Sequence, residues 1–231
     1  MAQASLVRRS FRFVALVLLG LCLLLAALLV LFRFVNPPTS AFMIAHQISG
    51  SGQGVQQQWV SLEQISPWMP LAVVASEDQR FPDHWGLDVH AIESAVREFA
   101  SGEGLRGAST ITQQTAKNLF LWSGRSMVRK GLEAGLALGL EVAWSKRRIM
   151  EVYLNIAEFG RGIYGIEAAS RAYFGIPARY LSPSQAARLA AVLPNPKVFS
   201  AAQPSAYVWQ RAEWIQQQMR QLGGTGYLAF L

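Results

Sequence analysis

The chain has 231 residues, about half of them hydrophobic, and its 21 lysines and arginines outnumber 14 acids to give a formal net charge of +7. This length allows one folded domain of roughly 150–200 residues beside a tail, and it leaves no room within the chain for a second large catalytic domain. The single cysteine, Cys22, excludes an internal disulfide and a cysteine-based metal site. The three scattered histidines are too few for a histidine-rich zinc site. The positive charge favours anionic partners such as phosphates, acidic lipids or nucleic acid.

The amino-terminal segment has the pattern of a membrane anchor. Arg8, Arg9 and Arg12 precede an uncharged run over 14–32 of about 19 residues, and a helix of that length spans roughly 28 Å, close to a hydrocarbon core. Arg33 follows the run where a signal peptide would have a small-residue cleavage site, which favours an uncleaved anchor. Because arginines cluster before the run, we expect a single-pass protein with its amino terminus in the cytoplasm and its remaining residues outside.

Four regions follow from these features. The prolines of "NPPTS" and the glycines of "SGSGQG" indicate a linker after the apolar run. We therefore predict a basic cytoplasmic tail over 1–13, a membrane anchor over 14–35, a linker or juxtamembrane segment over 36–60 and a folded domain over 61–231.

Helical periodicity dominates the domain, and strand-like alternation is nearly absent. Beyond an apolar run that ends near Glu77, the pattern predicts helices over 89–100, 110–121, 126–143, 146–157, 165–174, 182–193 and 205–222. The stretch "GLEAGLALGLEVAW" is interrupted by Glu133 and Glu141 and is too short for a second membrane span. We expect it to form the buried central helix of a bundle. The predicted fold class is mainly α.

Two adjacent acids, Glu77 and Asp78, end the apolar run. A carboxyl at such a position is partly desolvated, which raises its pKa toward the range in which it takes up a proton, so Glu77 is a candidate general base. The alternative is that both acids pair with Arg80 or cap the next helix. The local sequence leaves these two interpretations open. His84, which follows shortly after, is more typical of a structural hydrogen bond than of catalysis.

The block "GASTITQQTAKN" places Thr110, Gln114 and Lys117 on one face of a helix, because they are four and seven residues apart. Ser109 or Thr110 can cap that helix. The resulting polar stripe is either part of a binding site that ends in a cation or an ordinary solvated face.

A basic group stands at the start of the next apolar helix, where Arg125, Arg129 and Lys130 precede Glu133. Arg129 and Glu133 can form a surface ion pair, which contributes only about 0.3–0.5 kcal/mol. Positive charge in the first turn opposes the helix dipole, however, whereas an anion at that end is favoured by both the basic side chains and the free amides. Together with Lys117, this group therefore indicates a phosphate or diphosphate site.

The segment "KRRIMEVYLNIAEFGRGIYG" follows. Glu151 and Asn155 are four residues apart and are predicted to form a polar pair. The glycines at 160, 162 and 165 indicate a tight loop whose backbone approaches another group closely. We interpret most of this segment as structural support rather than as part of a reaction centre.

The domain contains five blocks whose order and spacing resemble the motif blocks of the peptidoglycan glycosyltransferases of family 51: "EDQRFPDHWGLD", "GASTITQQTAKN", "RKGLE", "KRRIMEVYLN" and "GIYGIEAASRAYFG". The resemblance covers roughly residues 61–196. It implies a mainly helical, lysozyme-like domain at the bacterial inner membrane, with a second small lobe partly embedded in lipid. The implied reaction polymerises lipid II: a 4-hydroxyl attacks the anomeric carbon of the growing chain, undecaprenyl diphosphate leaves, and an α-linked donor becomes a β-1,4 glycan.

The resemblance also implies roles for single residues. The candidate catalytic residues are Glu77, which matches the base for the acceptor hydroxyl, and Glu133, which matches a second essential acid near the diphosphate. The candidate substrate-binding residues, which match pocket-shaping and diphosphate-binding positions, are Asp78, Phe81, His84, Thr110, Gln114, Lys117, Arg125, Arg129 and Lys130. The family further implies a divalent metal, Mg²⁺ or Mn²⁺, whose ligands the sequence does not identify.

Two other functions are compatible with these residues. A lysozyme-like hydrolase or lytic transglycosylase would also use an acid on a helical fold, but it needs a protonated acid at the leaving oxygen and no diphosphate-binding group. A non-catalytic, membrane-anchored wall-binding scaffold would need only positive charge and aromatic side chains. The expected partners are lipid II, the growing glycan chain, the membrane and other cell-wall synthesis or division proteins, and no nucleic acid is expected.

Overall fold

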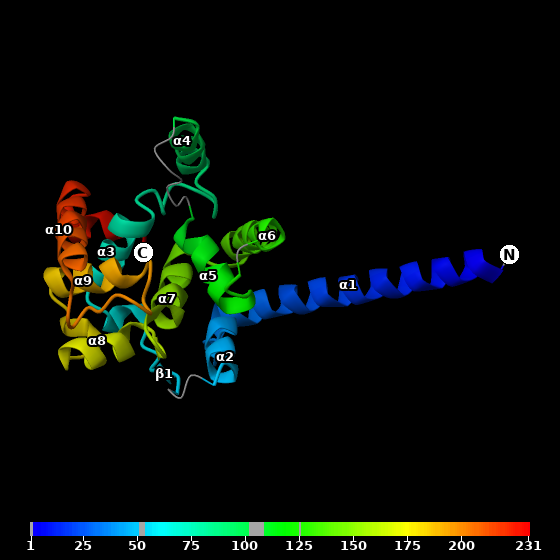
Figure 1. Cartoon of the computed structure of the whole chain (residues 1–231), viewed down its shortest axis with the longest axis horizontal. Coiled ribbons are helices and arrows are strands. Elements are labelled where there is room, and N and C mark those ends of the chain that lie inside the picture. Colours follow the sequence, from blue (N-terminus) through cyan, green and yellow to red (C-terminus); the bar gives the residue numbers. More distant parts are fainter. Residues whose placement is uncertain (1, 51–53, 102–108, 125) are drawn as a thin grey trace. The chain divides into compact units, whose positions relative to one another are not determined.

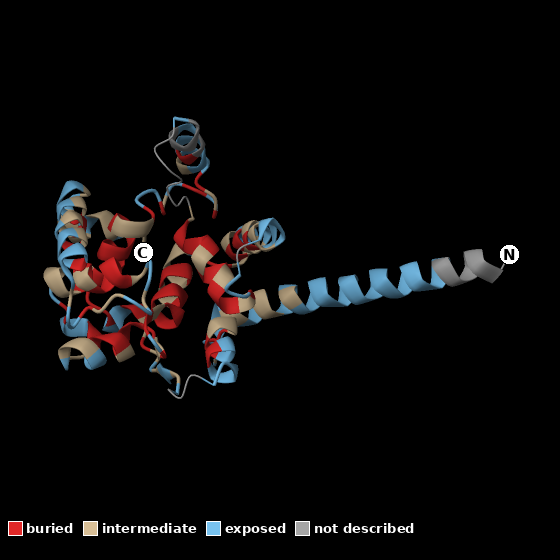
Figure 2. Cartoon of the chain, viewed as in Figure 1, coloured by how far each residue is buried: buried red, intermediate tan, exposed pale blue. Residues whose placement is uncertain are grey.

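The computed structural model describes residues 2–50, 54–101, 109–124 and 126–231, with only the backbone described at 2–7, 96 and 98–100, and it is mostly helical (Figure 1). The chain forms two compact units, Met1–Pro37 and Pro38–Leu231. The first contains the helix α1 (Ala2–Phe34), in which Arg8–Phe34 is long and apolar enough to cross a membrane. Its described side chains are mostly exposed (Figure 2). An apolar helix whose described side chains are mostly exposed is the form expected of a membrane anchor.

The segment over 36–60, predicted as a linker or juxtamembrane segment, contains regular structure, and the second unit begins at Pro38. Ser40 caps the helix α2 (Ala41–Ile48) by accepting a hydrogen bond from the Met43 amide at 3.2 Å. That helix buries Met43 and packs against α5 (Ile111–Phe120). The strand β1 (Gln56–Gln57) pairs with β3 (Ile163–Tyr164). Two short elements with distant partners therefore occupy a segment whose composition resembles a linker.

The predicted helices of the domain are confirmed, each within one residue at either end. The long helices are α3 (Trp68–Glu77), α4 (Val89–Ala100), α5, α6 (Met127–Ala143), α7 (Lys146–Ile156), α8 (Ile166–Phe174), α9 (Pro183–Val192) and α10 (Ala206–Gln221). Short 3₁₀ helices cover η1 (Leu62–Gln64), η2 (Ala178–Tyr180) and η3 (Gly224–Phe230). Five of the long helices begin after a capping side chain that accepts from the amide three residues on: Thr110, Ser126, Ser145, Ser182 and Ser205.

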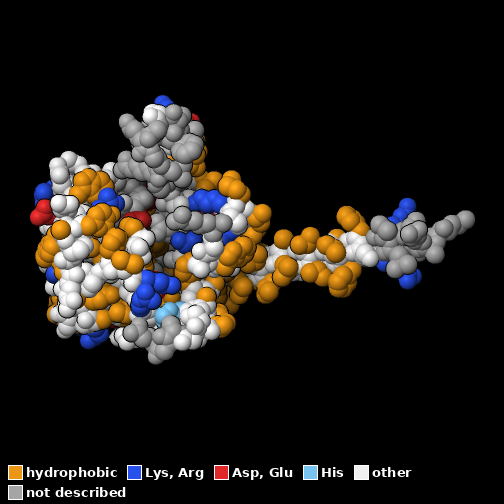
Figure 3. Space-filling view, in the orientation of Figure 1, with side chains coloured by type: hydrophobic (Ala, Val, Ile, Leu, Met, Phe, Trp, Pro, Cys, Tyr) orange, Lys and Arg blue, Asp and Glu red, His pale blue; other side chains and the backbone are white. Residues whose placement is uncertain are grey.

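The centre of the domain is α3, not α6 as predicted. All seven residues over 69–75 are buried, and α9, α10 and η3 pack around the helix (Figures 1 and 2). In α6 only Glu133, Ala137 and Leu140 are buried, on one stripe that faces α5, whereas Val142 is 76% exposed. Figure 3 shows hydrophobic side chains over α6 on the outside of the domain. An apolar sequence has thus produced an exposed apolar face instead of a buried helix.

The described residues include a small three-stranded sheet, although strand-like alternation is nearly absent from the sequence. Its order is β1–β3–β2, where β2 (Glu158–Gly160) runs antiparallel to β3 and β1 runs parallel to it. Gly162 and Gly165 have φ of 72° and 80°, and a Cβ at Gly165 would lie 2.7 Å from the Asn155 carbonyl oxygen. The predicted close approach of a glycine-containing loop is therefore confirmed, since a larger side chain would be strained at both positions.

The polar pair predicted on α7 does not pair side chain to side chain. Asn155 instead binds the Val60 backbone twice, accepting from its amide and donating to its carbonyl, both at 2.9 Å. Glu151 accepts from the Leu62 amide at 3.1 Å. The two side chains hold the segment that leads into α3, so this part of the chain is structural, as predicted.

We predict that Asn155→Ala lowers the free energy of unfolding by about 1–3 kcal/mol, because both backbone groups of the buried Val60 lose their partners. Asn155→Asp provides a matched comparison, since a carboxylate still accepts from the amide but cannot donate to the carbonyl. Thermal denaturation of the full chain in detergent should place both variants below wild type. An alanine variant as stable as wild type would contradict this account.

Candidate active site

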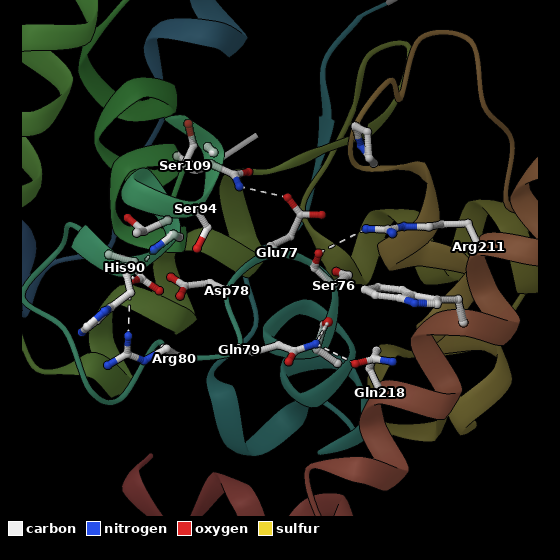
Figure 4. A pocket seen from close by; sticks show the side chains of 18 of the residues that line it. Ser76, Glu77, Asp78, Gln79, Arg80, His90, Ser94, Ser109, Arg211 and Gln218 are labelled. Carbon is white, nitrogen blue, oxygen red and sulfur yellow. Dashed lines mark hydrogen bonds and ion pairs between the residues drawn. The ribbon is translucent and has the colours of Figure 1, made fainter. Parts of the chain in front are cut away.

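A cleft of about 850 Å³ opens at the carboxyl end of α3. Glu77, the last residue of that helix, lies on its floor. Figure 4 shows Glu77 between His90 and Ser94 of α4 on one side and Arg211 of α10 on the other. Because residues 69–75 of α3 are all buried, the position of Glu77 is set by the core of the domain rather than by a surface loop.

A short chain of hydrogen bonds orients the Glu77 carboxylate. The buried Tyr153 hydroxyl donates to Gln114 Oε1 at 3.2 Å, and Gln114 Nε2 donates to Glu77 Oε2 at 3.0 Å. Burial raises the pKa of Tyr153 well above its usual range, so its hydroxyl stays protonated and acts as the donor. The Gln114 amide is thereby held with its oxygen toward the tyrosine and its nitrogen toward the carboxylate.

The environment of Glu77 favours proton uptake. Burial raises the pKa of its carboxyl, while the hydrogen bond from Gln114 and the charges of Arg211 and Lys117 act in the opposite direction. The net direction is upward, which brings the carboxyl closer to the working range of a general base. This is the behaviour predicted for the end of an apolar helix.

The neighbouring Asp78 is used differently. Its Oδ1 lies 2.8 Å from His84 Nε2, and its Oδ2 accepts from the Ile111 amide at 3.0 Å. A carboxylate at the first amide of α5 is also favoured by the helix dipole. Both oxygens are therefore engaged by the protein, so Asp78 lines the cleft but acts as a link between α3 and α5.

Three other residues that the resemblance places at the pocket are structural in their contacts. Phe81 is fully buried and packs edge-on against His84, and neither of the two lines the cleft. Thr110 does line it, but its hydroxyl donates to the Gly86 carbonyl at 2.6 Å and accepts from the Gln113 amide as the cap of α5. Phe81 and His84 therefore support the cleft indirectly, because their buried contacts hold the segment that follows Glu77 in place.

A cluster of cations lies next to the cleft, at the start of α6. The buried carboxylate of Glu133 accepts from Arg129 Nη1 at 2.5 Å and from Lys130 Nζ at 2.6 Å. Lys130 Nζ also donates to Ser109 Oγ at 2.7 Å, and Ser109 lines the cleft. Figure 3 shows basic side chains next to the apolar surface of α6. The ion pair predicted between Arg129 and Glu133 is confirmed, but it is buried and shared with a second cation.

Lys117 connects this cluster to Glu77. Burial lowers the pKa of the Lys117 ammonium, Glu133 and Glu77 act to raise it, and Arg129 and Lys130 lower it further. Its ammonium lies 5.5 Å from the centre of the Phe42 ring and makes no hydrogen bond or ion pair with the described residues. Three cations thus lie near two carboxylates, Glu133 and Glu77, which leaves positive charge that an anion can compensate.

Arg129 has a further donor to offer. Its Nε is buried and has no hydrogen-bond partner among the described residues. Arg125, the remaining cation of the predicted group, lies outside the described residues. The described residues therefore place incompletely compensated positive charge beside a desolvated carboxylate, an arrangement that suits an anion.

A metal held by protein side chains does not fit the donors at this site. Within the described ranges, no group of three or more His, Cys, Asp or Glu residues is placed to hold one. Both oxygens of Glu133 already accept hydrogen bonds from cations. The expected Mg²⁺ or Mn²⁺ therefore stays a prediction.

Sequence reasoning missed one wall of the cleft. It is formed by α10, which contributes Tyr207, Arg211, Trp214 and Gln218. Their spacing of four, three and four residues places them on one helical face, but such a pattern is typical of any amphipathic helix. Arg211 donates to the Ser76 carbonyl at 3.2 Å, next to Glu77 (Figure 4). Nothing in the local sequence links this helix to Glu77.

Comparison with known proteins agrees with this geometry. The transglycosylase family model matches residues 44–220. The chain is 58% identical over 206 residues to the biosynthetic peptidoglycan transglycosylase of Cronobacter sakazakii, covering 87% of this chain and 86% of the relative. The proteins of the same name from Marinomonas sp. and Escherichia coli are 58% and 54% identical, covering 87% and 94% of each chain. The chain belongs to the transglycosylase family.

Proposed function

We propose that this chain is a peptidoglycan glycosyltransferase that polymerises lipid II into β-1,4 glycan strands with release of undecaprenyl diphosphate. The observation that carries the proposal is a desolvated carboxylate, Glu77, within electrostatic reach of an incompletely compensated cation, Lys117. A base for a hydroxyl and a site for a departing anion are the two groups that this reaction requires. The names of the relatives, which are peptidoglycan transglycosylases, support the same substrate class.

The proposed step is a direct displacement. The acceptor 4-hydroxyl oxygen forms a bond to the anomeric carbon as the bond from that carbon to the diphosphate oxygen breaks. Glu77 takes the hydroxyl proton, and the electron pair of the broken bond stays on the diphosphate. Attack from the face opposite to the leaving group converts an α-linked donor into a β-linked product. Lys117, Arg129 and Lys130 stabilise the negative charge that grows on the diphosphate.

Glu133 has a positioning role in this scheme. Its carboxylate holds Arg129 and Lys130 by short charge-assisted hydrogen bonds, and its burial makes removal of either partner costly. Its two oxygens are occupied, so it is less suited to proton transfer than Glu77. The sequence resemblance to a second essential acid is compatible with this role, because a displaced Arg129 would weaken the anion site.

We further propose that the domain works at the extracytoplasmic surface of the bacterial inner membrane. The apolar helix α1 supports an anchor, and the arginines before it support a cytoplasmic amino terminus. The outer face of α6 supports contact with lipid, since Met127, Val128 and Val142 are all strongly exposed. A site next to such a face suits a substrate whose diphosphate is attached to a lipid.

The glycan-cleaving alternative gives no role to the cation cluster, since a hydrolase protonates a sugar oxygen and has no diphosphate to stabilise. The wall-binding scaffold gives no role to the oriented carboxylate. Both alternatives are separated from polymerisation by the variants below, because a scaffold tolerates loss of Glu77 and a hydrolase releases soluble sugars from preformed glycan.

We predict that Glu77→Gln reduces lipid II polymerisation by about 10²–10⁴-fold, the usual contribution of a general base. The variant should melt at or above the wild-type temperature. The raised pKa means that the folded state binds this proton more tightly than the unfolded state, so the ionised group costs stability at neutral pH. Asp83→Asn, at an exposed acid nearby, serves as the control. Polymerisation retained by Glu77→Gln would overturn the assignment of the base.

The pH dependence provides an independent check. Activity requires ionised Glu77, so kcat/KM should fall as the pH drops through the pKa of this group, at a higher pH than for an ordinary glutamate. Gln114→Leu removes a donor that stabilises the carboxylate, and it should move the acidic limb to still higher pH. Gln217→Leu, on the exposed face of α10, should leave the limb in place. A limb that is unchanged or lower in Gln114→Leu would contradict the proposed geometry.

For the anion site, we predict that Lys117→Ala lowers kcat by about 10²-fold, as expected when one stabilising donor is removed from developing charge. Lys117→Arg should recover part of the loss, whereas Arg220→Ala, at an exposed cation elsewhere, should behave as wild type. Inorganic pyrophosphate should inhibit wild type more strongly than Lys117→Ala. Equal inhibition together with normal turnover would show that this lysine does not bind the diphosphate.

A further inference from the structure

The helix α10 lines the cleft with residues from several of its turns. Tyr207, Arg211, Trp214 and Gln218 all line the cleft from one face of the helix. At the rise of an α-helix, this stripe is about 16 Å long, which is longer than a single sugar ring. None of these residues belongs to the five sequence blocks that carry the resemblance.

Most of the stripe is already engaged by the protein. The Arg211 guanidinium lies 4.2 Å from the centre of the Trp214 ring and donates to the Ser76 carbonyl. Gln218 Oε1 accepts from Gln79 Nε2 at 3.0 Å. These contacts brace α10 against the end of α3, and they leave Tyr207 as the member of the stripe with the most available surface.

Tyr207 has the arrangement of a binding platform. It is 50% exposed, and the Phe199 ring packs behind it with a centroid distance of 5.0 Å and an angle of 31° between the planes. Its hydroxyl makes no hydrogen bond with the described residues. A ring that is supported on one face and borders a cleft can receive a flat apolar surface on the other.

The chemistry of the wall suits a neutral saccharide. The side chains that line it from α10 include no acid, and Pro194 also lines the cleft. The faces of a β-linked pyranose carry C–H groups, which bear slight positive charge, and the face of an aromatic ring is negative. A sugar ring can therefore stack on Tyr207 without requiring a charged partner.

We propose that Tyr207, supported by Phe199, stacks against a sugar ring of the growing glycan strand and keeps the strand in the cleft between successive additions. This inference rests on the proposed function and deepens it, because it assigns strand retention to a residue distinct from the base and the anion site. Loss of the platform should shorten the product more than it slows the joining of the first two lipid II molecules.

The test compares product lengths made from lipid II by full-length variants in detergent. Tyr207→Ala should give glycans with a median length about three- to tenfold shorter than wild type, as expected for loss of one aromatic contact. Tyr207→Phe keeps the ring and should give wild-type lengths. Tyr180→Ala removes a tyrosine that is 63% exposed outside the cleft, and it should also give wild-type lengths.

Phe199→Ala provides a second variant, in which the platform loses its support while Tyr207 remains, and it should give glycans of intermediate length. Wild-type lengths from Tyr207→Ala would overturn the platform, as would equal shortening by Tyr180→Ala. Failure of the wild-type protein to polymerise lipid II would instead overturn the proposed function, so the two failures are distinguishable. Melting temperatures close to wild type are expected, because Tyr207 is half-exposed.

Discussion

The hydrogen bond from the Ile111 amide to the Asp78 carboxylate joins the end of α3 to the start of α5, and the geometry of the site depends on it. The position of α3 is set by burial, whereas α5 carries Gln114 and Lys117. Joining the two helix ends places the Gln114 amide against Glu77 and brings Lys117 within electrostatic reach of that carboxylate. Because the carboxylate also complements the helix dipole, the contact that aligns the helices is itself favoured by charge.

Burial and pairing divide the charged groups of the site into two kinds. Asp78 and Glu133 have both oxygens bound by protein donors, so they hold other groups in place. Glu77 and Lys117 are desolvated. Burial raises the pKa of Glu77 and lowers the pKa of Lys117, and both shifts favour the neutral form of the group. Their charges are the ones that a substrate can compensate, by a hydroxyl proton at Glu77 and by an anion at Lys117. In this way two adjacent acids, Glu77 and Asp78, acquire different roles from different surroundings.

Helix boundaries between residues 89 and 222 could be predicted because capping side chains such as Ser126 and Ser182 satisfy the first free amides locally. Which helix forms the centre of the domain could not be predicted in the same way. The sequence of α6 is strongly apolar, but apolar character does not reveal whether a face meets protein or another apolar phase, and Met127 and Val142 remain exposed. The regular structure within 36–60 could not be predicted for a related reason, since α2 and β1 have their partners far along the chain.

The sequence by itself determined the apolar anchor, the helical domain, and Glu77 and Lys117 as candidate groups for a base and an anion site, because composition, periodicity and motif spacing are local properties. Only the tertiary structure decided that Asp78 links α3 to α5, and that the α10 wall with Tyr207 and Arg211 borders Glu77. The bond from Arg211 to Ser76 joins residues 135 positions apart. Contacts at that separation arise from packing of the whole domain, and they leave no signature in either segment alone.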